Sequence, residues 1–457
     1  MKFKYYFVLL LLQVLQIQGQ DKFSKQDLYE DLAYLKKALI ESQYDIYETV
    51  SQQAFEKGFH HIKSKISKDS YNLLEATKIL QQLPVLVNNG HTSIDFPGSE
   101  YMKYANSGNS TLFPLEIAFE GNKPLIRKNW SNNTDIKLGD EILSINNRSM
   151  NQILDQIYPQ VSGESKLMKN SKIEMYSLPR YYWQIFGQVD TFNVRVKQNG
   201  KEKKYTIKAV PLMEGFENVR TRVLNAEMTL KFYDEIAYLN PGSFDGDLEK
   251  FKSFIKESFA KILNNKSNKL IIDLRNNSGG DNVFSDYMVS YIADKPFTWN
   301  SSFTLRTSKL LKETGATKKN SSNYWKSIFS HTDGERYTYT FDKTLPQPKN
   351  LTFKGDVYVL VNRQSHSQAT VTAAQIQDYN FGKIVGEETA EYPSLIASVF
   401  YFNLPKTGIK VQVSKGKMIR VNGSEKPEGV IPDIVIKDYL LDEEDEILKE
   451  LLQRLQL

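Results

Sequence analysis

Cysteine is absent from this sequence of 457 residues, and histidine occurs only five times. Without cysteine the chain can form neither a disulfide nor a thiolate metal site, and it has no cysteine nucleophile. Imidazole is the side chain best suited to act as a base near neutral pH. The candidates for such a base are therefore few, namely His60, His61, His91, His331 and His366. We find no motif for a cofactor or a metal ion, and we expect neither.

An excess of one charge and long apolar runs are also missing. The net charge of +5 is small for this length and gives no reason to expect nucleic acid as a partner. Beyond residues 1–19, no apolar stretch approaches the length of a membrane span. Residues 1–19 combine Lys2 and Lys4 with the apolar run Phe7–Leu12 and the small Gly19, which is typical of a secretory signal peptide, with an uncleaved anchor as the alternative. We therefore expect an exported protein, periplasmic or extracellular, without a stable membrane anchor.

The apolar pattern changes along the chain and predicts several domains. Residues 20–97 carry apolar side chains at helical spacing, whereas residues 98–212 consist of short alternating runs and turn signals. Residues 213–457 alternate apolar strands with amphipathic helices, which predicts α/β architecture for this part and an α+β multidomain chain overall. Within it, residues 297–350 are polar and irregular, and we interpret them as a long surface excursion.

Two serines lie where a predicted buried strand becomes a predicted helix. The apolar run Val357–Val361 is followed by Ser365 and Ser367, and a helical pattern then extends to about Asn380. Backbone N–H groups at the start of a helix are free to bind an anion. A serine there can be a nucleophile beside an oxyanion hole, or it can simply cap the helix.

Two further segments combine a turn with residues that could take part in a site. The predicted buried strand Lys269–Arg275 is followed by Asn276–Asp281, where glycines would let the backbone approach a ligand and direct N–H groups at it. His91 follows an Asn-Asn-Gly turn, at the junction of a loop and a predicted strand. A single histidine in such a place is more often structural than catalytic.

Three separated motifs resemble those of the C-terminal-processing and tricorn-core serine peptidases. They are the strand and glycine turn Leu270–Gly280, the segment Asn362–Ser367 with the later Gly386–Thr389, and the closing motif Gly429–Asp433. The resemblance implies a tail-specific or tricorn-like serine peptidase, with a ClpP/crotonase-like α/β core over residues 213–457. It also implies a peptide or protein substrate.

A fourth motif lies in the β-rich region. The segment Ile136–Asn146, with a Gly-Asp turn before an alternating strand, resembles the core of a PDZ domain. The resemblance implies a PDZ-like domain over residues 98–212. The Gly-Leu-Gly-Phe type of loop, with which such domains capture a terminal carboxylate, is not recognisable here.

The family resemblance assigns roles by position. Ser367 matches the nucleophile, whose hydroxyl would attack a peptide carbonyl and form an acyl-enzyme. The backbone N–H of Gln368 and one N–H from Gly279 or Gly280 match the oxyanion hole, which acts because the charge they face develops in the transition state.

The residues that act as base and acid are assigned less directly. Members with a Ser–Lys dyad carry lysine in a Thr-Phe-Gly-Lys motif, and Tyr392 stands at the matching place in Thr389–Tyr392. The tricorn-like branch uses a histidine from the start of the fold, which His91 matches; His366 is the alternative base. Glu425 or Glu428, beside the closing motif, could orient the imidazole, or both could be solvated loop charges.

We thus predict an exported serine peptidase that hydrolyses peptide bonds through an acyl-enzyme on Ser367, with His91 as general base. If a histidine is the base, we expect the acidic limb of the pH–rate profile to have an apparent pKa of about 6–7. Two alternatives remain: a catalytically impaired homologue that only binds peptides, and a hydrolase acting on a non-peptide ester.

Overall fold

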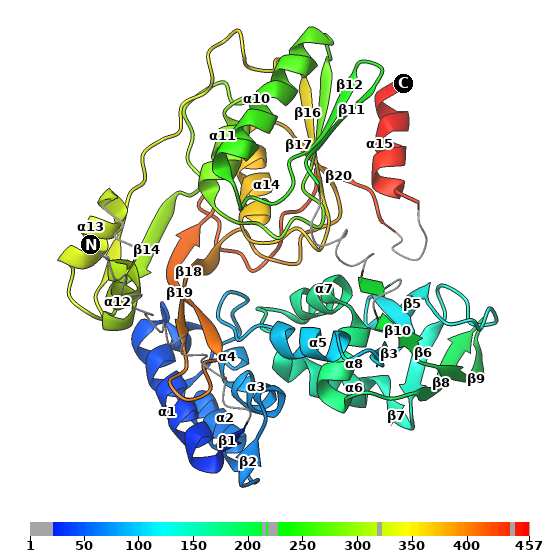
Figure 1. Ribbon diagram of the computed structural model, residues 1–457. Coiled ribbons are helices and arrows are strands. Elements are labelled where there is room, and N and C mark those ends of the chain that lie inside the picture. Colours follow the sequence, from blue (N-terminus) through cyan, green and yellow to red (C-terminus); the bar gives the residue numbers. More distant parts are fainter. Residues whose placement is uncertain (1–21, 213–215, 218–226, 318–321, 439–443, 457) are drawn as a thin grey trace, which may run out of the picture.

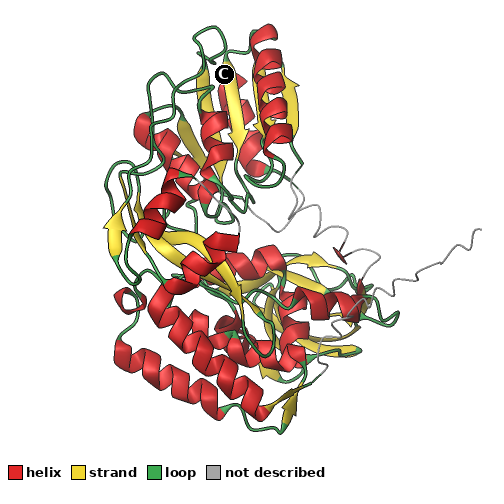
Figure 2. Ribbon diagram, turned by 60° about the vertical axis from the view of Figure 1, so that its left-hand side comes forward, coloured by secondary structure: helices red, strands yellow, loops and turns green. Residues whose placement is uncertain are grey.

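The computed structural model describes residues 22–212, 216–217, 227–317, 322–438 and 444–456. The expected signal peptide, residues 1–19, lies outside the described residues. Among the residues that are described, no helix is both long and apolar enough to cross a membrane. In two views the α/β core lies at one end of the molecule, and the N-terminal helices and the β-rich region lie at the other end (Figures 1 and 2).

A six-stranded sheet forms the centre of the C-terminal core. Its strands follow the order β11 (Thr229–Tyr233), β12 (Ile236–Asn240), β13 (Lys269–Asp273), β16 (Asp356–Val361), β17 (Lys383–Gly386) and β20 (Ile434–Val435). All neighbours are parallel except β11, which is antiparallel to β12. The helices are α10 (Leu248–Asn264), α11 (Asn282–Val289) and α14 (Gln368–Tyr379) on one face and α15 (Glu446–Gln456) on the other (Figure 1). The predicted α/β architecture is confirmed.

Both faces of this sheet are buried, which explains why its strands are continuous apolar runs. On β13, Leu270 and Ile272 pack into the core with α10, α11 and α14, while Ile271 faces the opposite way toward Ile447 and Leu451 of α15. Successive side chains of a strand point to opposite faces. The carboxyl ends of β13, β16 and β17 consequently lie side by side at one edge of the sheet.

A second, antiparallel sheet joins the core to the N-terminal helices. Its order is β15 (Arg336–Thr338), β14 (Ser302–Arg306), β19 (Lys410–Ile419) and β18 (Leu395–Asn403). One apolar cluster combines this sheet with the helices α1 (Lys25–Ser42), α2 (Gln52–Ser64), α3 (Leu73–Leu80), α4 (Gln82–Val85), α12 (Lys309–Thr317) and α13 (Asn323–Ser330).

Residues 297–350 are therefore not a surface excursion, and that prediction was wrong. Their few apolar side chains, such as Phe303, Leu305, Leu311 and Ile328, are buried in the cluster that includes the N-terminal helices. Many polar residues lie between them, so the segment has a low average hydrophobicity although its described part contains two strands and two helices.

The middle of the chain forms a separate sheet with helices beside it. The sheet has the order β4 (Leu115–Glu120), β5 (Lys123–Asn129), β6 (Glu141–Ile145), β8 (Thr191–Gln198) and β9 (Lys201–Lys208), and β7 (Arg148–Ser149) pairs with β6. Three helices, α6 (Met150–Ile157), α7 (Lys166–Tyr176) and α8 (Leu178–Phe186), bury apolar residues against it. The sequence predicted the strands but not these helices, and the PDZ-like interpretation stays a prediction.

Short elements complete the described chain: β1 (Phe23–Ser24), the 3-10 turns Ile46–Glu48 and Tyr158–Gln160, β2 (Ser70–Tyr71), α5 (Gly98–Ala105), β3 (Thr111–Leu112) and β10 (Val210–Pro211).

Candidate active site

Ser367 occupies a strained turn between β16 and α14. Its backbone angles, φ 52° and ψ −123°, are uncommon for a residue with a side chain. It precedes the first residue of α14, yet its side chain makes no capping hydrogen bond to the helix. The β13–α11 turn packs directly against it, since a Cβ added to Gly279 would lie 2.6 Å from the Ser367 Cβ. The hydroxyl is thus held by surrounding structure rather than used as a cap.

Ser365, two residues earlier, has a different environment. Its hydroxyl donates to the carbonyl oxygen of Leu274 at 2.8 Å and accepts the backbone N–H of Asn362 at 3.2 Å. The residue is fully buried. Ser365 therefore ties the β16–α14 turn to the end of β13 and has no hydroxyl free for a substrate.

His91 lies directly opposite Ser367, although the two are 276 positions apart, and its Nε2 is 3.0 Å from the Ser367 Oγ. Several contacts hold the loop that follows α4. The Gln412 side chain donates to the His91 carbonyl oxygen at 3.0 Å, and the Glu164 Oε1 accepts the backbone N–H of Gly90 at 2.8 Å. His91 itself donates its backbone N–H to Asn89 Oδ1 at 3.2 Å. Contacts from β19 and from the middle of the chain thus position the imidazole.

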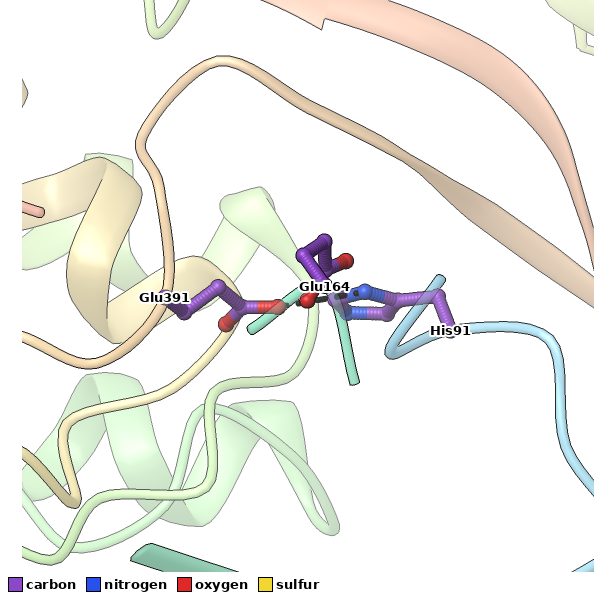
Figure 3. A group of neighbouring side chains, drawn as sticks. All are labelled: His91, Glu164 and Glu391. Carbon is purple, nitrogen blue, oxygen red and sulfur yellow. Dashed lines mark ion pairs between the residues drawn. The ribbon is translucent and has the colours of Figure 1, made fainter. Parts of the chain in front are cut away.

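The acidic neighbour of His91 is Glu391. Its Oε1 lies 3.2 Å from the His91 Nδ1 (Figure 3). Its Oε2 accepts the backbone N–H of Ser367. The contact between Glu391 Oε1 and His91 Nδ1 has the distance of an ion pair. It lacks the alignment of a hydrogen bond, since neither atom makes one. Only 1% of Glu391 is exposed. One carboxylate therefore contacts both the candidate base and the backbone of the candidate nucleophile.

Glu391 was not predicted from the sequence. Its segment, Thr389–Tyr392, matches the place where other members carry a lysine, and the residue that matches that lysine is Tyr392. The signal in the sequence was the place of this segment after the apolar run that forms β17; the structure adds that the carboxyl end of β17 adjoins that of β16, which leads to Ser367. A carboxylate just beyond a strand at that edge is a candidate for the site. Tyr392 itself does not line the cavity around Ser367.

Glu425 and Glu428 lie elsewhere. Glu425 pairs with Lys417 at 2.9 Å and its side chain is 58% exposed, while Glu428 approaches Lys426 at 3.9 Å and is 40% exposed. Neither lines the cavity that contains Ser367. The closing motif beside them supports the Glu391 segment instead, since the Val430 N–H donates to the Thr389 hydroxyl at 2.9 Å.

Two of the three candidate oxyanion donors remain available. Gln368 is the first residue of α14, so its N–H has no carbonyl one turn earlier within the helix. The Gly279 N–H is engaged by Asn277 Oδ1 at 2.8 Å. Among the residues that the structure describes, no hydrogen bond occupies the Gly280 N–H, and Gly280 lines the cavity with Ser367. A side chain there is excluded, because a Cβ would lie 2.0 Å from the Phe244 carbonyl oxygen.

His366 is close to the site but does not face the Ser367 hydroxyl. Its Nε2 lies 3.5 Å from Ser171 Oγ, and its Nδ1 lies 3.8 Å from Glu391 Oε2. Burial lowers the pKa of His366 to about 3, helped by the charge of Lys172. The imidazole is therefore neutral and packed between α7 and the nucleophile turn.

Burial also shifts the pKa values of Glu391 and His91. It raises the pKa of Glu391 to about 7, against the opposing effects of the Ser367 N–H and Lys172. It lowers the pKa of His91 to about 4, an effect that the Glu164 charge opposes. Near neutral pH, His91 is consequently an unprotonated base and Glu391 is close to its titration point.

The side chains of Ser367, His91 and Glu391 line a cavity of about 580 Å³. Aromatic and thioether side chains form part of its wall, together with basic groups from the middle of the chain; these residues are Phe96, Met168, Lys172, Met175, Tyr176, Arg180 and Tyr181. A cavity with apolar walls and a few polar groups beside a nucleophile suits a substrate that carries apolar side chains.

The family model "Peptidase family S41" matches residues 235–436. The "Tail-specific protease" of Haemophilus influenzae (strain ATCC 51907 / DSM 11121 / KW20 / Rd) is 28% identical over 206 residues, which cover 42% of this chain and 25% of that protein. This chain thus spans about a quarter of the length of that relative.

Two solved structures share the fold over nearly all of both chains. Mature CPAF covers 94% of this chain and 96% of its own, with a TM-score of 0.63 at 15% identity. Mature CPAF complexed with lactacystin covers 94% and 98%, with a TM-score of 0.61 at 15% identity. Residues 235–436 are thus similar to peptidase family S41, and this match confirms the resemblance to the C-terminal-processing and tricorn-core serine peptidases.

Proposed function

We propose that this protein is a serine peptidase in which Ser367 is the nucleophile, His91 the general base and Glu391 the acidic member of the triad. The observation that carries the proposal is the continuous series of contacts from the Ser367 Oγ through the His91 imidazole to the Glu391 carboxylate, with distances of 3.0 Å and 3.2 Å. The family match and the tail-specific relative support the reaction class. Glu391 replaces Glu425 and Glu428 in this assignment.

Each group has a defined task. His91 Nε2 accepts the Ser367 proton as the hydroxyl oxygen attacks the scissile carbonyl, and the resulting imidazolium then protonates the leaving amine. Ionised Glu391 offsets the charge of the imidazolium and keeps the proton of the neutral ring on Nδ1. Water, activated by His91 in the same way, hydrolyses the acyl-enzyme and restores Ser367.

The backbone N–H groups of Gln368 and Gly280 are our proposed oxyanion hole. Both belong to turns at the carboxyl ends of adjacent parallel strands, β16 and β13, which keeps their spacing fixed. Donors that are already in place cost no reorganisation when the tetrahedral oxyanion forms. The Gly279 N–H is left out because Asn277 engages it.

The substrate is a peptide or protein, and we propose cleavage near carboxyl termini by analogy with the relative named tail-specific protease. We further propose export through residues 1–19, a helical region over 20–97, a PDZ-like domain over 98–212 and the peptidase core over 213–457. The apolar run after two lysines supports export, and the five-stranded order β4-β5-β6-β8-β9 supports a separate middle domain.

Hydrolysis of a peptide library, followed by mass spectrometry, tests the proposal. The wild-type protein should produce new peptide termini and Ser367→Ala should produce none. Products that the Ser367→Ala protein forms equally well would contradict the assignment. Binding of peptides without any turnover would favour the catalytically impaired homologue, and turnover of esters alone would favour the ester hydrolase.

A further inference from the structure

Three potential metal ligands converge beside the proposed nucleophile. One ring nitrogen of His91 and one carboxylate oxygen each of Glu164 and Glu391 lie within 4.8 Å of one another (Figure 3). The three residues come from three separate segments: the loop after α4, the loop before α7 and the loop after β17. The proposed mechanism uses His91 and Glu391 but leaves Glu164 without a chemical role.

In the described part of the chain, each of these side chains has one atom that makes a hydrogen bond and one atom that makes none. His91 Nε2 contacts Ser367, Glu164 Oε1 accepts the Gly90 N–H and Glu391 Oε2 accepts the Ser367 N–H. The other atoms, His91 Nδ1, Glu164 Oε2 and Glu391 Oε1, are buried and make no hydrogen bond. Buried polar atoms are nearly always satisfied. Each side chain is therefore oriented by one atom, while its second atom makes no hydrogen bond. His91 Nδ1 and Glu391 Oε1 lie 3.2 Å apart, and a bound ion would take the place of that contact.

The donor set determines which ligand fits. One imidazole nitrogen with two carboxylate oxygens suits Zn²⁺, which binds three protein ligands and leaves a fourth position open. Mg²⁺ and Ca²⁺ prefer oxygen ligands and larger coordination numbers. The nearby Lys172 ammonium opposes a cation, but it donates to the carbonyl oxygens of Gly90 at 3.1 Å and Ser162 at 2.9 Å. Once both carboxyl groups are ionised, two carboxylates against one ammonium favour a divalent ion.

We propose that His91, Glu164 and Glu391 bind Zn²⁺ and that the bound ion inhibits the enzyme. A neutral imidazole that gives its Nδ1 lone pair to zinc must carry its single proton on Nε2. Nε2 is the atom 3.0 Å from the Ser367 Oγ, so it would become a donor and could not accept the serine proton. An imidazole held in the wrong tautomer loses about 10⁴ in kcat in a serine protease. The inhibition rests on the proposed function, whereas the binding of zinc does not.

Titration of the Ser367→Ala protein with ZnCl₂ in a calorimeter tests the binding, because this variant keeps all three ligands and needs no activity. At about pH 7.5, where the ligands can release their protons, it should bind one zinc ion per chain. Adding Glu164→Gln should weaken the affinity by at least about tenfold, the lower end of what a perturbed metal site loses. The glutamine retains the acceptor for the Gly90 N–H, so the loop remains in place.

Asp95→Asn is the matched control, because Asp95 lines the same cavity but lies outside the cluster. It should leave zinc affinity unchanged. Should Glu164→Gln fail to fold, as judged by thermal melting without zinc, Glu391→Gln replaces it. Absence of zinc binding, or equal binding with and without Glu164, would overturn the site; the second result would point to a surface site such as the histidine pair of α2, His60 and His61.

Activity then tests the inhibition separately. Zn²⁺ should stop peptide hydrolysis by the wild-type enzyme, EDTA should restore it, and Mg²⁺ should have no effect. Hydrolysis that continues at saturating zinc would overturn the inhibitory role. A wild-type protein that binds zinc through Glu164 yet never hydrolyses peptide would refute the proposed function while leaving the metal site intact.

Discussion

The two halves of the candidate site are built in different ways. Ser367, Gly280 and Glu391 follow the adjacent parallel strands β16, β13 and β17, so one sheet determines their relative positions. His91 comes from a loop near the start of the chain and reaches Ser367 only because other segments hold that loop. The nucleophile half should therefore survive local changes, whereas the base half depends on contacts between distant regions.

The nucleophile half should show the largest effect when it is altered. We expect Ser367→Ala to lower kcat by about 10⁶, as loss of the nucleophile does in serine proteases. The melting temperature should change little, because the Ser367 side chain makes no cap to α14. Ser365→Ala is the matched control; it should keep its catalytic groups and lose about 1–3 kcal/mol of stability, since it removes a buried hydrogen bond.

The base half should show almost the same loss, because a triad acts as a unit. We expect His91→Ala to lower kcat nearly as much as Ser367→Ala, and the double variant to be no worse than either single one. His366→Ala should cost far less, since His366 does not contact the Ser367 hydroxyl. Steady-state kinetics of the wild type and these four variants measures the losses. An additive double variant would mean that His91 and Ser367 act independently.

Glu391 connects the two halves, and its removal should have the next largest effect. Glu391→Gln should lower kcat by up to about 10⁴, because the ring loses the group that fixes its tautomer and offsets its charge. The circular dichroism spectrum should not change, since glutamine keeps an oxygen for the Ser367 N–H. Retention of full activity would return the search for the acid to other carboxylates.

The pH dependence distinguishes Glu391 from His91. Burial raises the pKa of Glu391 to about 7, so its useful ionised form disappears as the pH falls through 7. Burial lowers the pKa of His91 to about 4, so the base itself remains neutral down to that pH. In chelator-containing buffer, kcat/KM should thus show an acidic limb near 7. The sequence predicted a similar limb but attributed it to histidine.

Glu391→Gln provides the control for that attribution. The residual activity of this variant should lose the limb near 7 and fall only as His91 is protonated, near pH 4. An unchanged limb in Glu391→Gln would assign the titration to another group.

The smallest effect should come from the two glutamates first considered from the sequence. Glu425→Gln and Glu428→Gln should leave kcat/KM unchanged and alter stability by at most about 1 kcal/mol, as is usual for exposed ion pairs. A loss of activity comparable with that of Glu391→Gln would contradict the geometry described above.

The two halves of the site also differ in how much of each could be predicted from the sequence. The strands β13 and β16 are continuous apolar runs, and the turns after them have distinctive residues, so the two turns could be located directly. The choice of Ser367 rather than Ser365 as the nucleophile came from the family resemblance. His91 could be named only through the family resemblance, because its partner lies 276 positions away. Its supports, Glu164 and Gln412, belong to other elements, and no local pattern reveals them.

Glu391 was missed for a related reason. Its segment carries no period and no turn signal, and the position considered there was that of a lysine in other members, one residue later. The side chain matters because β17 pairs with β16 in parallel, and strand order is not visible in a single sequence. The same limit hid the partners of residues 297–350, whose apolar side chains meet the N-terminal helices.

The most direct test of the account is the rate at which a fluorophosphonate labels each variant in the presence of chelator, with the site mapped by peptide mass spectrometry. The central claim is that His91 and Glu391 activate Ser367. It predicts one adduct on Ser367 in the wild-type protein, none in Ser367→Ala, and labelling of His91→Ala slower by about a thousandfold or more. An adduct on another residue, or equal labelling rates for wild type and His91→Ala, would contradict it.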